Sequence, residues 1–481
     1  MKTLWFFLML CLSIRQAVAV ESELTPDWRN QVVDQQQWQQ YFAQSEQLQR
    51  LDRQFLADEL KQLNQSKASK AVKHQKFGFP EQPESAFWSS AEAERMALAI
   101  LSFQTPSGGW SKRTDMATQP RQLGQMFGTE ADYIPTFDND ATSTQILWLT
   151  AFLPYAKKAI RPKLQQAIER AIGFVLAAQY PNGGFAQTYP LRSGYHDAIT
   201  LNDHVMTELL KLLNKVATDP QFAFINSAVR QQAQQQFFRG IELLLKAQIK
   251  VNGVLTVWAA QHHPLTLQAI KARAYELPAL VSSESAEVTL LLMQLPKPSA
   301  AVIQSVEAAV AWFQAKQIRD TEMQRSDNGV RFVKKIGAKP LWARFYDLEK
   351  QQPLFVDRNG IVVSTMAQLS IERQKGYGWY QSNAQAVLKA YPQWKAGLVE
   401  HPDNRLSNRV EISGEIPSPG EAGVGLLNFE TFDHIHQSGC HACQFLTCGV
   451  GLIGSSRCLY SQIFNSNQAS VDVTSHMSLL F

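Results

Sequence analysis

Two acidic loops, each directly before an expected helix, carry residue types that bind calcium. The first reads DNDATST and contains Asp138 and Asn139; the second, YHDAITLNDHVM, contains Asp197, Asn202 and Asp203. Carboxylates and an amide so close together offer several hard oxygens to one cation, which is what Ca²⁺ requires. The same residue types also favour helix N-cap positions, so an N-cap cluster is the alternative interpretation of each loop.

Basic residues in other loops form a second group of candidates. Arg273 lies in ARAYELP, where a surface ion pair with Glu276 is the plainer alternative. Lys112 follows a GGW phrase, Arg344 lies in PLWARFYD, and Arg358 lies in FVDRNG. Placement in loops favours function over packing, and guanidinium groups bind carboxylates bidentately. A groove lined by these groups would suit a polyanionic chain.

A phrase that occurs three times predicts the elements that position these loops. It reads QTPSGGW at 104–110, QYPNGGF at 179–185 and QIKVNGV at 248–254, and each copy follows an apolar stretch with helical spacing. A long period that ends in a helix and a glycine turn indicates stacked helix pairs, with glycine in the left-handed conformation at the helix end. We therefore predict helical hairpins curled around a centre, and both acidic loops are then expected to face the same central groove.

Tryptophans lie in or near several of these loops. Their rings can stack on sugar faces, or they can be buried in the core. The four concerned are Trp110, Trp258, Trp342 and Trp379.

Apolar periodicity predicts a mainly helical chain with few strands. Ser89 and Glu92 form a predicted capping box, and residues 28–64 are expected to form one long or two short helices that pack on the body. Further helices are expected at about 140–157, 161–180, 202–217, 225–249, 285–294, 299–317 and 381–391. Short strands are expected only at Arg331–Val333 and Pro353–Val356.

Composition and the N-terminal segment limit the class of protein. The chain has 481 residues and a formal net charge of +4, which is not a nucleic-acid-binding signature. Lys2, an apolar run over 4–14 and the small residues at 17–19 predict a signal peptide over residues 1–19, and the run is too short to span a bilayer. We expect an exported monomer, periplasmic or secreted, without a membrane or nucleic-acid partner.

The chain divides into four predicted parts. After the signal peptide come an N-terminal helical segment and linker (20–85, with the linker over 66–85), a helical domain (86–396) and an atypical tail (397–481). All four cysteines of the mature chain lie in this tail, at Cys440, Cys443, Cys448 and Cys458. They fit a zinc site, two disulfides, or an extension without a fixed structure.

Several long phrases, in order along residues 30–395, resemble the pectate lyases of polysaccharide lyase family ten. They are GGWSK (108–112), TFDNDAT (136–142), NGGFAQTYPLRSGYHDAITLND (182–203), VWAAQHHPLTLQ (257–268), ARAYELP (272–278), SES (283–285), PLWARFYD (340–347) and GYGWY (376–380). The chain departs from the family pattern at His263, where an acidic residue is expected, and at 282–285, where a glycine is usual.

The resemblance implies an incomplete (α/α) toroid with a central groove and Ca²⁺-dependent β-elimination of polygalacturonate. It places Asp138, Asn139 and Asp203 at the calcium site and Arg273 in the role of catalytic base. It also implies that Arg344, Arg358 and, by a weaker match, Lys112 bind the substrate. Arginine as a base is chemically demanding, because the pKa of its side chain normally exceeds about 12.

Two other functions fit parts of the pattern. Triterpene cyclases are helical toroids with similar Gln–Gly–aromatic phrases, but they need a DxDD acid, and the segment Asp138–Ala141 lacks its last aspartate. A non-catalytic protein that binds acidic polysaccharides would need the basic and aromatic residues, but not Arg273 together with a metal site.

Overall fold

The computed structural model describes residues 23–327 and 329–400. The expected signal peptide and the four cysteines of the tail lie outside the described residues, so the interpretations of both stay predictions. The described residues belong to one compact unit.

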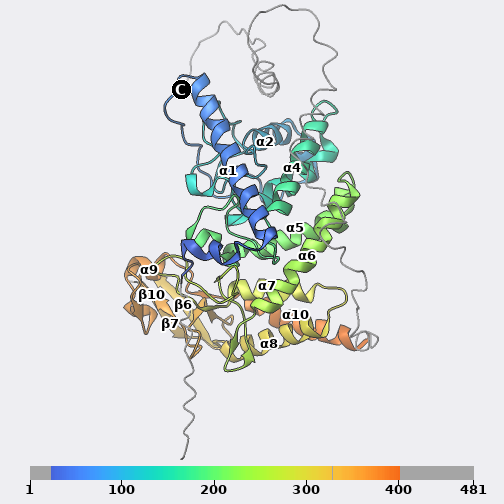
Figure 1. The fold of residues 1–481 in the computed structure, drawn as a ribbon. Coiled ribbons are helices and arrows are strands. Elements are labelled where there is room, and N and C mark those ends of the chain that lie inside the picture. Colours follow the sequence, from blue (N-terminus) through green and yellow to red (C-terminus); the bar gives the residue numbers. More distant parts are fainter. Residues whose placement is uncertain (1–22, 328, 401–481) are drawn as a thin grey trace, which may run out of the picture. The chain divides into compact units, whose positions relative to one another are not determined.

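Helices dominate this unit and form two rows (Figure 1). Each helix of one row pairs with a helix of the other and also contacts the next helix of its own row. Helix α10 (Ala384–Glu400) packs against α7 (Ser283–Met293) and α8 (Ala300–Lys316). One row contains α3 (Ser143–Phe152), α5 (Val205–Thr218) and α7 (Ser283–Met293); the other contains α4 (Arg161–Ala178), α6 (Ser227–Ala247) and α8 (Ala300–Lys316), with α2 (Ala91–Ser102) against α3. This is the predicted incomplete (α/α) toroid.

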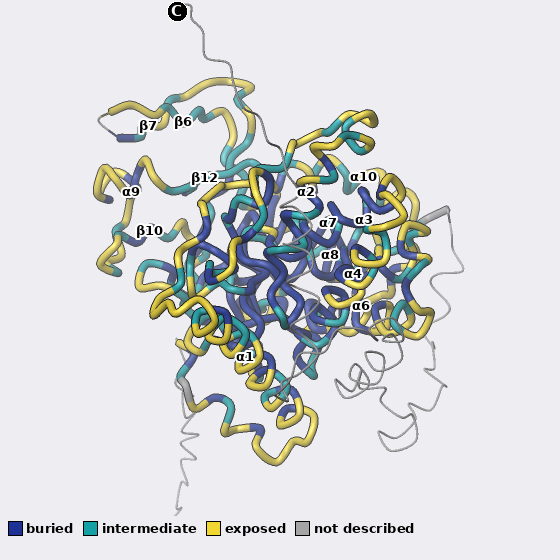
Figure 2. Tube along the Cα trace, turned by 90° about the horizontal axis from the view of Figure 1, so that it is seen from above, coloured by how far each residue is buried: buried dark blue, intermediate teal, exposed yellow. Residues whose placement is uncertain are grey.

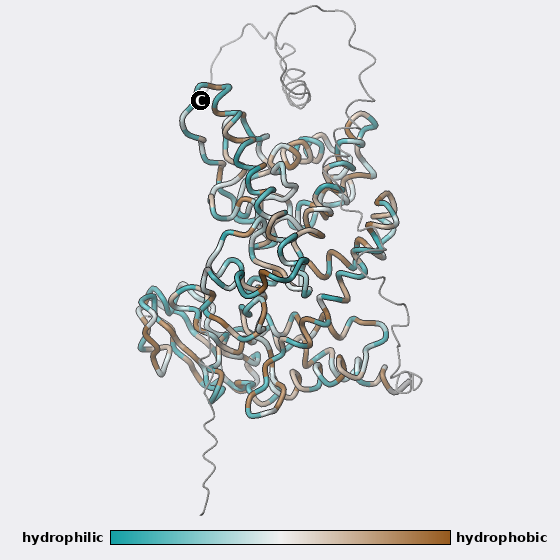
Figure 3. Tube along the Cα trace, viewed as in Figure 1, coloured by the Kyte–Doolittle hydropathy of each residue, from teal (hydrophilic) through white to brown (hydrophobic). Residues whose placement is uncertain are grey.

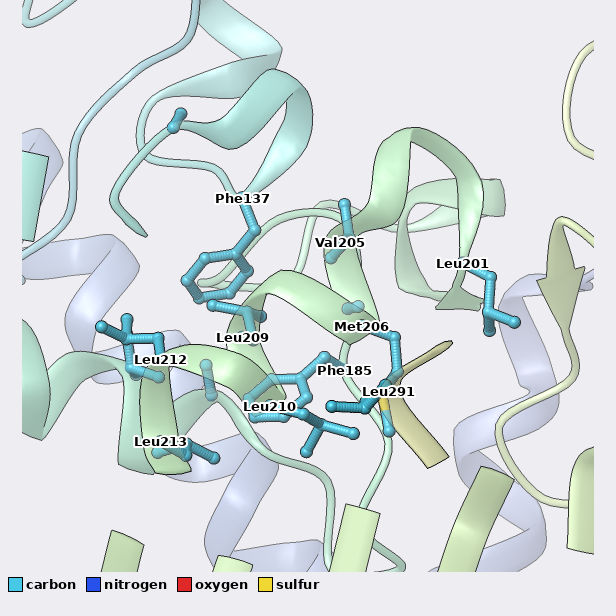
Figure 4. Close-up of a cluster of buried hydrophobic side chains, with 14 of the residues drawn as sticks. Phe137, Phe185, Leu201, Val205, Met206, Leu209, Leu210, Leu212, Leu213 and Leu291 are labelled. Carbon is cyan, nitrogen blue, oxygen red and sulfur yellow. The ribbon is translucent and has the colours of Figure 1, made fainter. Parts of the chain in front are cut away.

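The row of α3, α5 and α7 lies at the centre of the core. Seen from above, the dark blue of buried residues gathers around these helices and their partners (Figure 2). Figure 4 shows the cluster around α5, which includes Val205, Met206, Leu209 and Phe137, the residue directly before Asp138. The starts of α3 and α5 are therefore anchored in the core, and this fixes the loops that precede them.

The repeated glutamines hold neighbouring hairpins together. Gln179 Nε2 donates to Gly183 O of its own turn (3.0 Å) and to Gln236 O of α6 (2.9 Å). Gln104 makes the equivalent bonds to its turn and to α4, and Gln248 to its turn and to α8. Gly183 has φ +101°, and a Cβ there would lie 2.5 Å from Arg239 O, so the turn requires glycine. The repeated phrase therefore has a structural role, because it links neighbouring helical hairpins of the toroid.

A fourth copy of the unit exists that the sequence analysis missed. Gln317 follows α8 and lies 69 residues after Gln248, the spacing already seen between the second and third copies. The hairpin of β6 (Thr321–Ser326) and β7 (Gly329–Lys334) is inserted between Ile318 and Leu341, whose backbones pair. The insertion hides the repeat because the glycine turn no longer follows the glutamine.

The tryptophans at the ends of the copies are core residues. Trp110, Trp258 and Trp342 each donate an indole N–H to a carbonyl of the preceding helix, those of Ile100, Leu244 and Phe313. All three are 0% exposed and Trp379 is 1% exposed. The idea that these four rings stack on sugars is therefore wrong, because no ring face is accessible.

Two predicted helix boundaries need correction. The N-cap of α2 is Ser90, whose Oγ accepts the N–H of Ala93, whereas Ser89 ends a 3₁₀ turn. Helix α10 (Ala384–Glu400) continues through Pro392, although proline normally ends a helix. Tyr391 and Trp394 on either side of this proline pack against the core, and this tertiary packing favours continuation. The predicted boundary at 396/397 consequently falls inside a helix.

The strands are short and form two-stranded antiparallel pairs. Strand β7 contains the predicted segment 331–333, and strand β10 (Phe355–Val356) overlaps the predicted segment 353–356, but the expectation that these would be the only strands is wrong. The pairs besides β6–β7 are β1 (Ile199–Thr200) with β4 (Gln261–His262), β2 (Lys250–Val251) with β3 (Val254–Leu255), β5 (Leu280–Val281) with β9 (Phe345–Tyr346), β8 (Trp342–Ala343) with β12 (Tyr380–Gln381), and β10 (Phe355–Val356) with β11 (Val362–Val363). Strands β5, β9 and β10, together with Trp379, form a small second core next to the main one.

The N-terminal segment forms one long helix, α1 (Gln36–Gln62), which is the first of the two predicted alternatives, preceded by a 3₁₀ helix at Pro26–Val32. Tyr41 Oη donates to Ala178 O at the end of α4, and Asp52 accepts the N–H of Ser107 (2.8 Å) in the first repeated turn. Residues 66–85, expected to be a linker, lie against the body through backbone bonds such as His74 N–H to Arg113 O. Hydrophilic residues interrupt the helices along their length (Figure 3), and no described helix is long and apolar enough to cross a membrane.

Candidate active site

Two short turns with left-handed residues stand side by side in front of α3 and α5. The first is η4 (Asp138–Asp140) and the second is η7 (Asn202–His204), and they contact each other. Asn139 and Asp203 have φ values of 51° and 50°. Left-handed residues other than glycine are uncommon, and they concentrate at functional sites where the surrounding fold enforces them. The buried cluster around α5 supplies that enforcement here.

Both turns carry carboxylate and amide oxygens. Asp138 is 3% exposed, and neither its Oδ1 nor the buried Asn139 Oδ1 has a hydrogen-bond partner among the described residues. Asp203 Oδ2 accepts a bond from Asn202 Nδ2 (2.8 Å). Burial, followed by the negative charge of Asp138, raises the pKa of Asp203 to about 6. Unpaired buried oxygens and two mutually repelling carboxylates fit a hard divalent cation, which would satisfy both.

The donor set is an open one. In residues 23–327 and 329–400, no three His, Cys, Asp or Glu side chains are grouped as in a closed metal site. The two turns offer two carboxylates and one amide, fewer than the six to eight oxygens that Ca²⁺ takes. Positions would therefore remain for water or for an anionic ligand.

Lys112 lies behind Asp138 and is buried. Its Nζ lies 2.6 Å from Asp138 Oδ2, 3.7 Å from Glu130 Oε2, and 3.3 Å from the centroid of the Tyr133 ring. The ammonium thus neutralises one oxygen of Asp138 and leaves Oδ1 for another ligand. Sequence reasoning assigned Lys112 to substrate binding; the structure places it as the partner of a predicted metal ligand.

Arg344 joins the second turn to α7. Its Nη2 donates to Asn202 Oδ1 and to Glu284 Oε1, both at 3.0 Å. Burial acts to lower the pKa of Arg344, but Glu284 and other nearby groups outweigh it and the pKa is raised. The structure therefore adds Glu284, at the start of α7, to the site. In the sequence, the feature that could have identified Glu284 was its position at the start of α7, the third helix of the row that contains α3 and α5.

Arg273 forms a bidentate pair with Glu276. Arg273 Nε donates to Glu276 Oε2 at 2.7 Å and Nη2 donates to Oε1. These bonds raise the pKa of Arg273 above its ordinary value, against the opposing effect of burial. The side chain of Arg273 is 46% exposed and that of Glu276 is 8% exposed, so a ligand can reach the guanidinium while the carboxylate lies beneath it.

Three guanidinium groups surround the ring of Tyr275. The Cζ atoms of Arg273 and Arg358 both lie 5.1 Å from the ring centroid, and that of Arg373 lies 4.4 Å away. Arg358 is exposed and pairs with Glu372, whereas Arg373 is 1% exposed. Burial lowers the pKa of Arg373. Sequence reasoning missed Arg373, because a single arginine in a short amphipathic helix carries no distinguishing signal.

Tyr377 connects the two groups of residues. Its ring centroid lies 4.9 Å from Arg344 Cζ and 3.8 Å from Arg373 Cζ, and its hydroxyl donates to Glu276 Oε1 (3.4 Å). The structure therefore brings the predicted residues into one connected site, with oxygens for a cation on one side and guanidinium groups on the other. This arrangement is chemically suited to a carboxylate-bearing ligand next to a cation.

The two departures from the family pattern leave this site intact. His263 is fully buried, and its Nδ1 accepts the N–H groups of Leu265 and Thr266. Ser282 and Ser283 are likewise bonded to the neighbouring backbone and to Asn383. His263, Ser282 and Ser283 therefore stabilise the backbone conformation around them.

Comparisons with known proteins agree with this geometry. The sequence model of the family described as pectic acid lyase matches residues 104–388, more than half of the chain. Two similar solved structures are a family 10 polysaccharide lyase from Cellvibrio cellulosa and an alanine mutant of it in complex with trigalacturonic acid. Each is 33% identical with a TM-score of 0.56, and the match covers 64% of this chain and 94% and 96% of those chains, respectively. A comparison with curated proteins finds no match. The chain therefore belongs to the pectic acid lyase family and is a polysaccharide lyase.

Proposed function

We propose that this enzyme is a pectate lyase that cleaves polygalacturonate by calcium-dependent β-elimination and releases unsaturated oligogalacturonides. One observation carries the proposal: the unpartnered oxygens of Asp138 and Asn139 share a site with the guanidinium cluster around Tyr275. A cation site alone would fit many proteins, and an arginine cluster alone would fit any polyanion. Their combination fits a uronate whose carboxylate is bound by both.

Asp138, Asn139 and Asp203 would hold the Ca²⁺ ion. When bound, the ion would act as a Lewis acid that stabilises negative charge developing on the substrate carboxylate. Asp203 must be ionised to contribute, and an adjacent divalent charge would lower its pKa from the raised value. Lys112 holds Asp138 in place through Oδ2 and leaves Oδ1, which would then be available to the ion.

Arg273 would take the proton from C5 of the galacturonate at the cleaved bond. This proton is weakly acidic because it lies α to a carboxylate. A neutral guanidine is required for the transfer, and Glu276 opposes it by stabilising the protonated form. Substrate binding must therefore loosen the Arg273–Glu276 pair, and the positive charges of Arg358 and Arg373 act in the required direction.

Arg358 and Arg344 would bind substrate carboxylates. Arg358 is the more available of the two, since its side chain is 53% exposed and its ion-pair partner Glu372 is exposed as well. Arg344 is held between Asn202 and Glu284, so it supports the second turn as well as any carboxylate next to it. We also propose that the enzyme is exported and acts as a monomer, on the basis of the N-terminal signal and the self-contained site.

The test is a lyase assay on purified mature protein. Polygalacturonate is incubated with enzyme, and the ultraviolet absorbance of the unsaturated product is followed with added Ca²⁺ or with excess EGTA after exhaustive dialysis. We expect product only with calcium. Full turnover in EGTA would refute the metal assignment. Binding of oligogalacturonides without any product under either condition would identify a binding protein instead.

A further inference from the structure

A buried arginine stands close to Asp203, which holds the Ca²⁺ ion in the proposed function on which this inference rests. Arg344 Nη2 donates to Asn202 Oδ1 (3.0 Å), and Asn202 Nδ2 donates to Asp203 Oδ2 (2.8 Å). Burial and then the charge of Asp138 raise the pKa of Asp203 to about 6, while the charge of Arg344 acts against both. A guanidinium group pairs readily with a carboxylate. Arg344 is therefore a potential competitor of the cation for Asp203.

Glu284 holds Arg344 away from that role. Glu284 Oε1 accepts a second bond from Arg344 Nη2, also at 3.0 Å, and the two side chains are 3% and 13% exposed. Arg344 Nε is buried and has no partner among the described residues. Both hydrogen bonds that fix the guanidinium thus come from Nη2. Without Glu284, one of them would remain, and a positive charge next to the calcium site would have lost its carboxylate.

The side chain of Asn202 transmits the position of Arg344 to Asp203. Its amide oxygen accepts from Arg344 and its amide nitrogen donates to Asp203, and a reversed amide could make neither bond. The backbone N–H of Asn202 donates to Ala260 O (3.0 Å), so the turn itself is held separately. Arg344 and Asn202 therefore control the Asp203 carboxylate, whereas the backbone bond fixes the path of the chain.

The stability of the fold does not explain the Glu284 side chain. Its Oε2 is buried and has no hydrogen-bond partner in residues 23–327 and 329–400, and an unsatisfied buried acceptor is destabilising. The position in the first turn of α7 (Ser283–Met293) makes a negative charge tolerable, because the helix N-terminus is electropositive. A buried ion pair is weak evidence for a stabilising role. The contact with Arg344 instead indicates a role in the site.

We propose that Glu284 is a positioning residue of the calcium site, which keeps Arg344 on Asn202 and thereby leaves Asp203 free to bind the cation. Glu284 acts in two ways. It neutralises a positive charge that would otherwise repel Ca²⁺, and it withholds a guanidinium group from the carboxylate that the ion needs.

The experiment measures Ca²⁺ binding by titration calorimetry without substrate, so that no contact between Arg344 and the substrate contributes. For Glu284→Gln, Kd should rise by about 10- to 100-fold, as is typical when a partner of a metal ligand is removed. Excess calcium should partly restore kcat on polygalacturonate. The matched control is Glu287→Gln on the same helix, which removes a partner of Lys211 (3.3 Å) and should leave Kd unchanged.

A double variant tests whether Glu284 acts through Arg344. When Arg344→Met is added to Glu284→Gln, the competing charge is gone, so Kd should return toward the wild-type value. This recovery would not occur if Glu284 itself bound the ion. A Kd as high as that of Glu284→Gln alone would therefore overturn the proposal.

The results distinguish this proposal from the proposed function. If wild type binds no calcium or makes no unsaturated product, the proposed function fails, and this proposal fails with it. If wild type does both and Glu284→Gln binds calcium with an unchanged Kd, Glu284 alone has been assigned wrongly. If Glu284→Gln does not fold, Glu284→Asp decides, because it keeps the charge but withdraws the carboxylate from Arg344. A raised Kd then supports the proposal, and an unchanged Kd overturns it.

Discussion

Replacement of Arg273 by alanine is expected to change both catalysis and stability. The effect on stability arises because Glu276, the partner of Arg273, is buried, and it can be measured separately from the effect on kcat. If Arg273 is the base, kcat on polygalacturonate should fall by about 10²- to 10⁴-fold with a small change in KM. That range corresponds to about 3–5 kcal/mol of transition-state stabilisation at 1.36 kcal/mol per tenfold. Lysine should not restore activity, since one ammonium does not reproduce the planar, forked guanidinium.

The same change should also lower stability by a smaller, separable amount. Glu276 is 7% exposed, and without the Arg273 side chain its remaining side-chain partner among the described residues is Tyr377 Oη at 3.4 Å. Leaving a buried acceptor unsatisfied costs about 1–3 kcal/mol, more for a charged group, which should lower the melting temperature by roughly 2–4 °C. Arg358→Ala is the contrast, because its partner Glu372 is exposed and such pairs contribute about 0–1 kcal/mol.

A double variant distinguishes the two effects. Arg273→Ala with Glu276→Gln removes the stranded charge, so the melting temperature should recover while kcat remains low. The assays are steady-state kinetics by product absorbance and thermal unfolding by circular dichroism. If Arg273→Ala raises KM and leaves kcat unchanged, Arg273 binds substrate and the base must be sought elsewhere in the site. If Arg358→Ala shifts KM less than Arg273→Ala does, the assignment of Arg358 as a substrate clamp is refuted.

Four further predictions follow from the structure. Asp138→Ala should weaken calcium binding measured by titration calorimetry, and excess calcium should partly restore activity; unchanged affinity would exclude it as a ligand. Because the pKa of Asp203 is raised from 3.8 to about 6 in the folded protein without calcium, Asp203 costs stability progressively as pH rises through this interval, and the full cost is present above about pH 6. Calcium should therefore raise the melting temperature more at pH 8 than at pH 5, and an equal increase at both would contradict this. A chain ending after Glu400, the last residue of α10, should fold and cleave; an insoluble or inactive product would show that the tail is required. Gln179→Ala should lower the melting temperature, since its amide ties two hairpins together, while kcat of the folded enzyme stays unchanged; a selective loss of kcat would assign it a role in the site.

Much of the fold follows from local patterns in the sequence. Helix positions follow from apolar periodicity, since burial of one face stabilises a helix wherever the chain has room to form one. The repeated glutamine phrase also marks the ends of the helices, because glycine adopts the left-handed backbone that these turns need. The acidic and basic residues of the site were visible for a related reason: polar groups concentrated in loops are rarely there for packing.

The predicted element boundaries that were wrong lie where tertiary contacts outweigh the local conformational preference of the sequence. Pro392 normally ends a helix, yet α10 continues to Glu400 because Tyr391 and Trp394 pack on the core. The fourth repeat beginning at Gln317 was hidden by an inserted hairpin. The four tryptophans were ambiguous in the sequence, because an indole serves equally well to fill a core or to stack on a sugar.

The sequence alone determined the helical class, the repeat and the identities of the candidate residues, because these depend on residue type and spacing along the chain. Only the tertiary structure decided which charges meet. Lys112 pairs with Asp138, Arg344 with Glu284 and Arg273 with Glu276. Electrostatic effects depend on the distance between two charges and on their burial. The sequence shows neither for Lys112 and Asp138, which are 26 residues apart, or for Arg344 and Glu284, which are 60 residues apart.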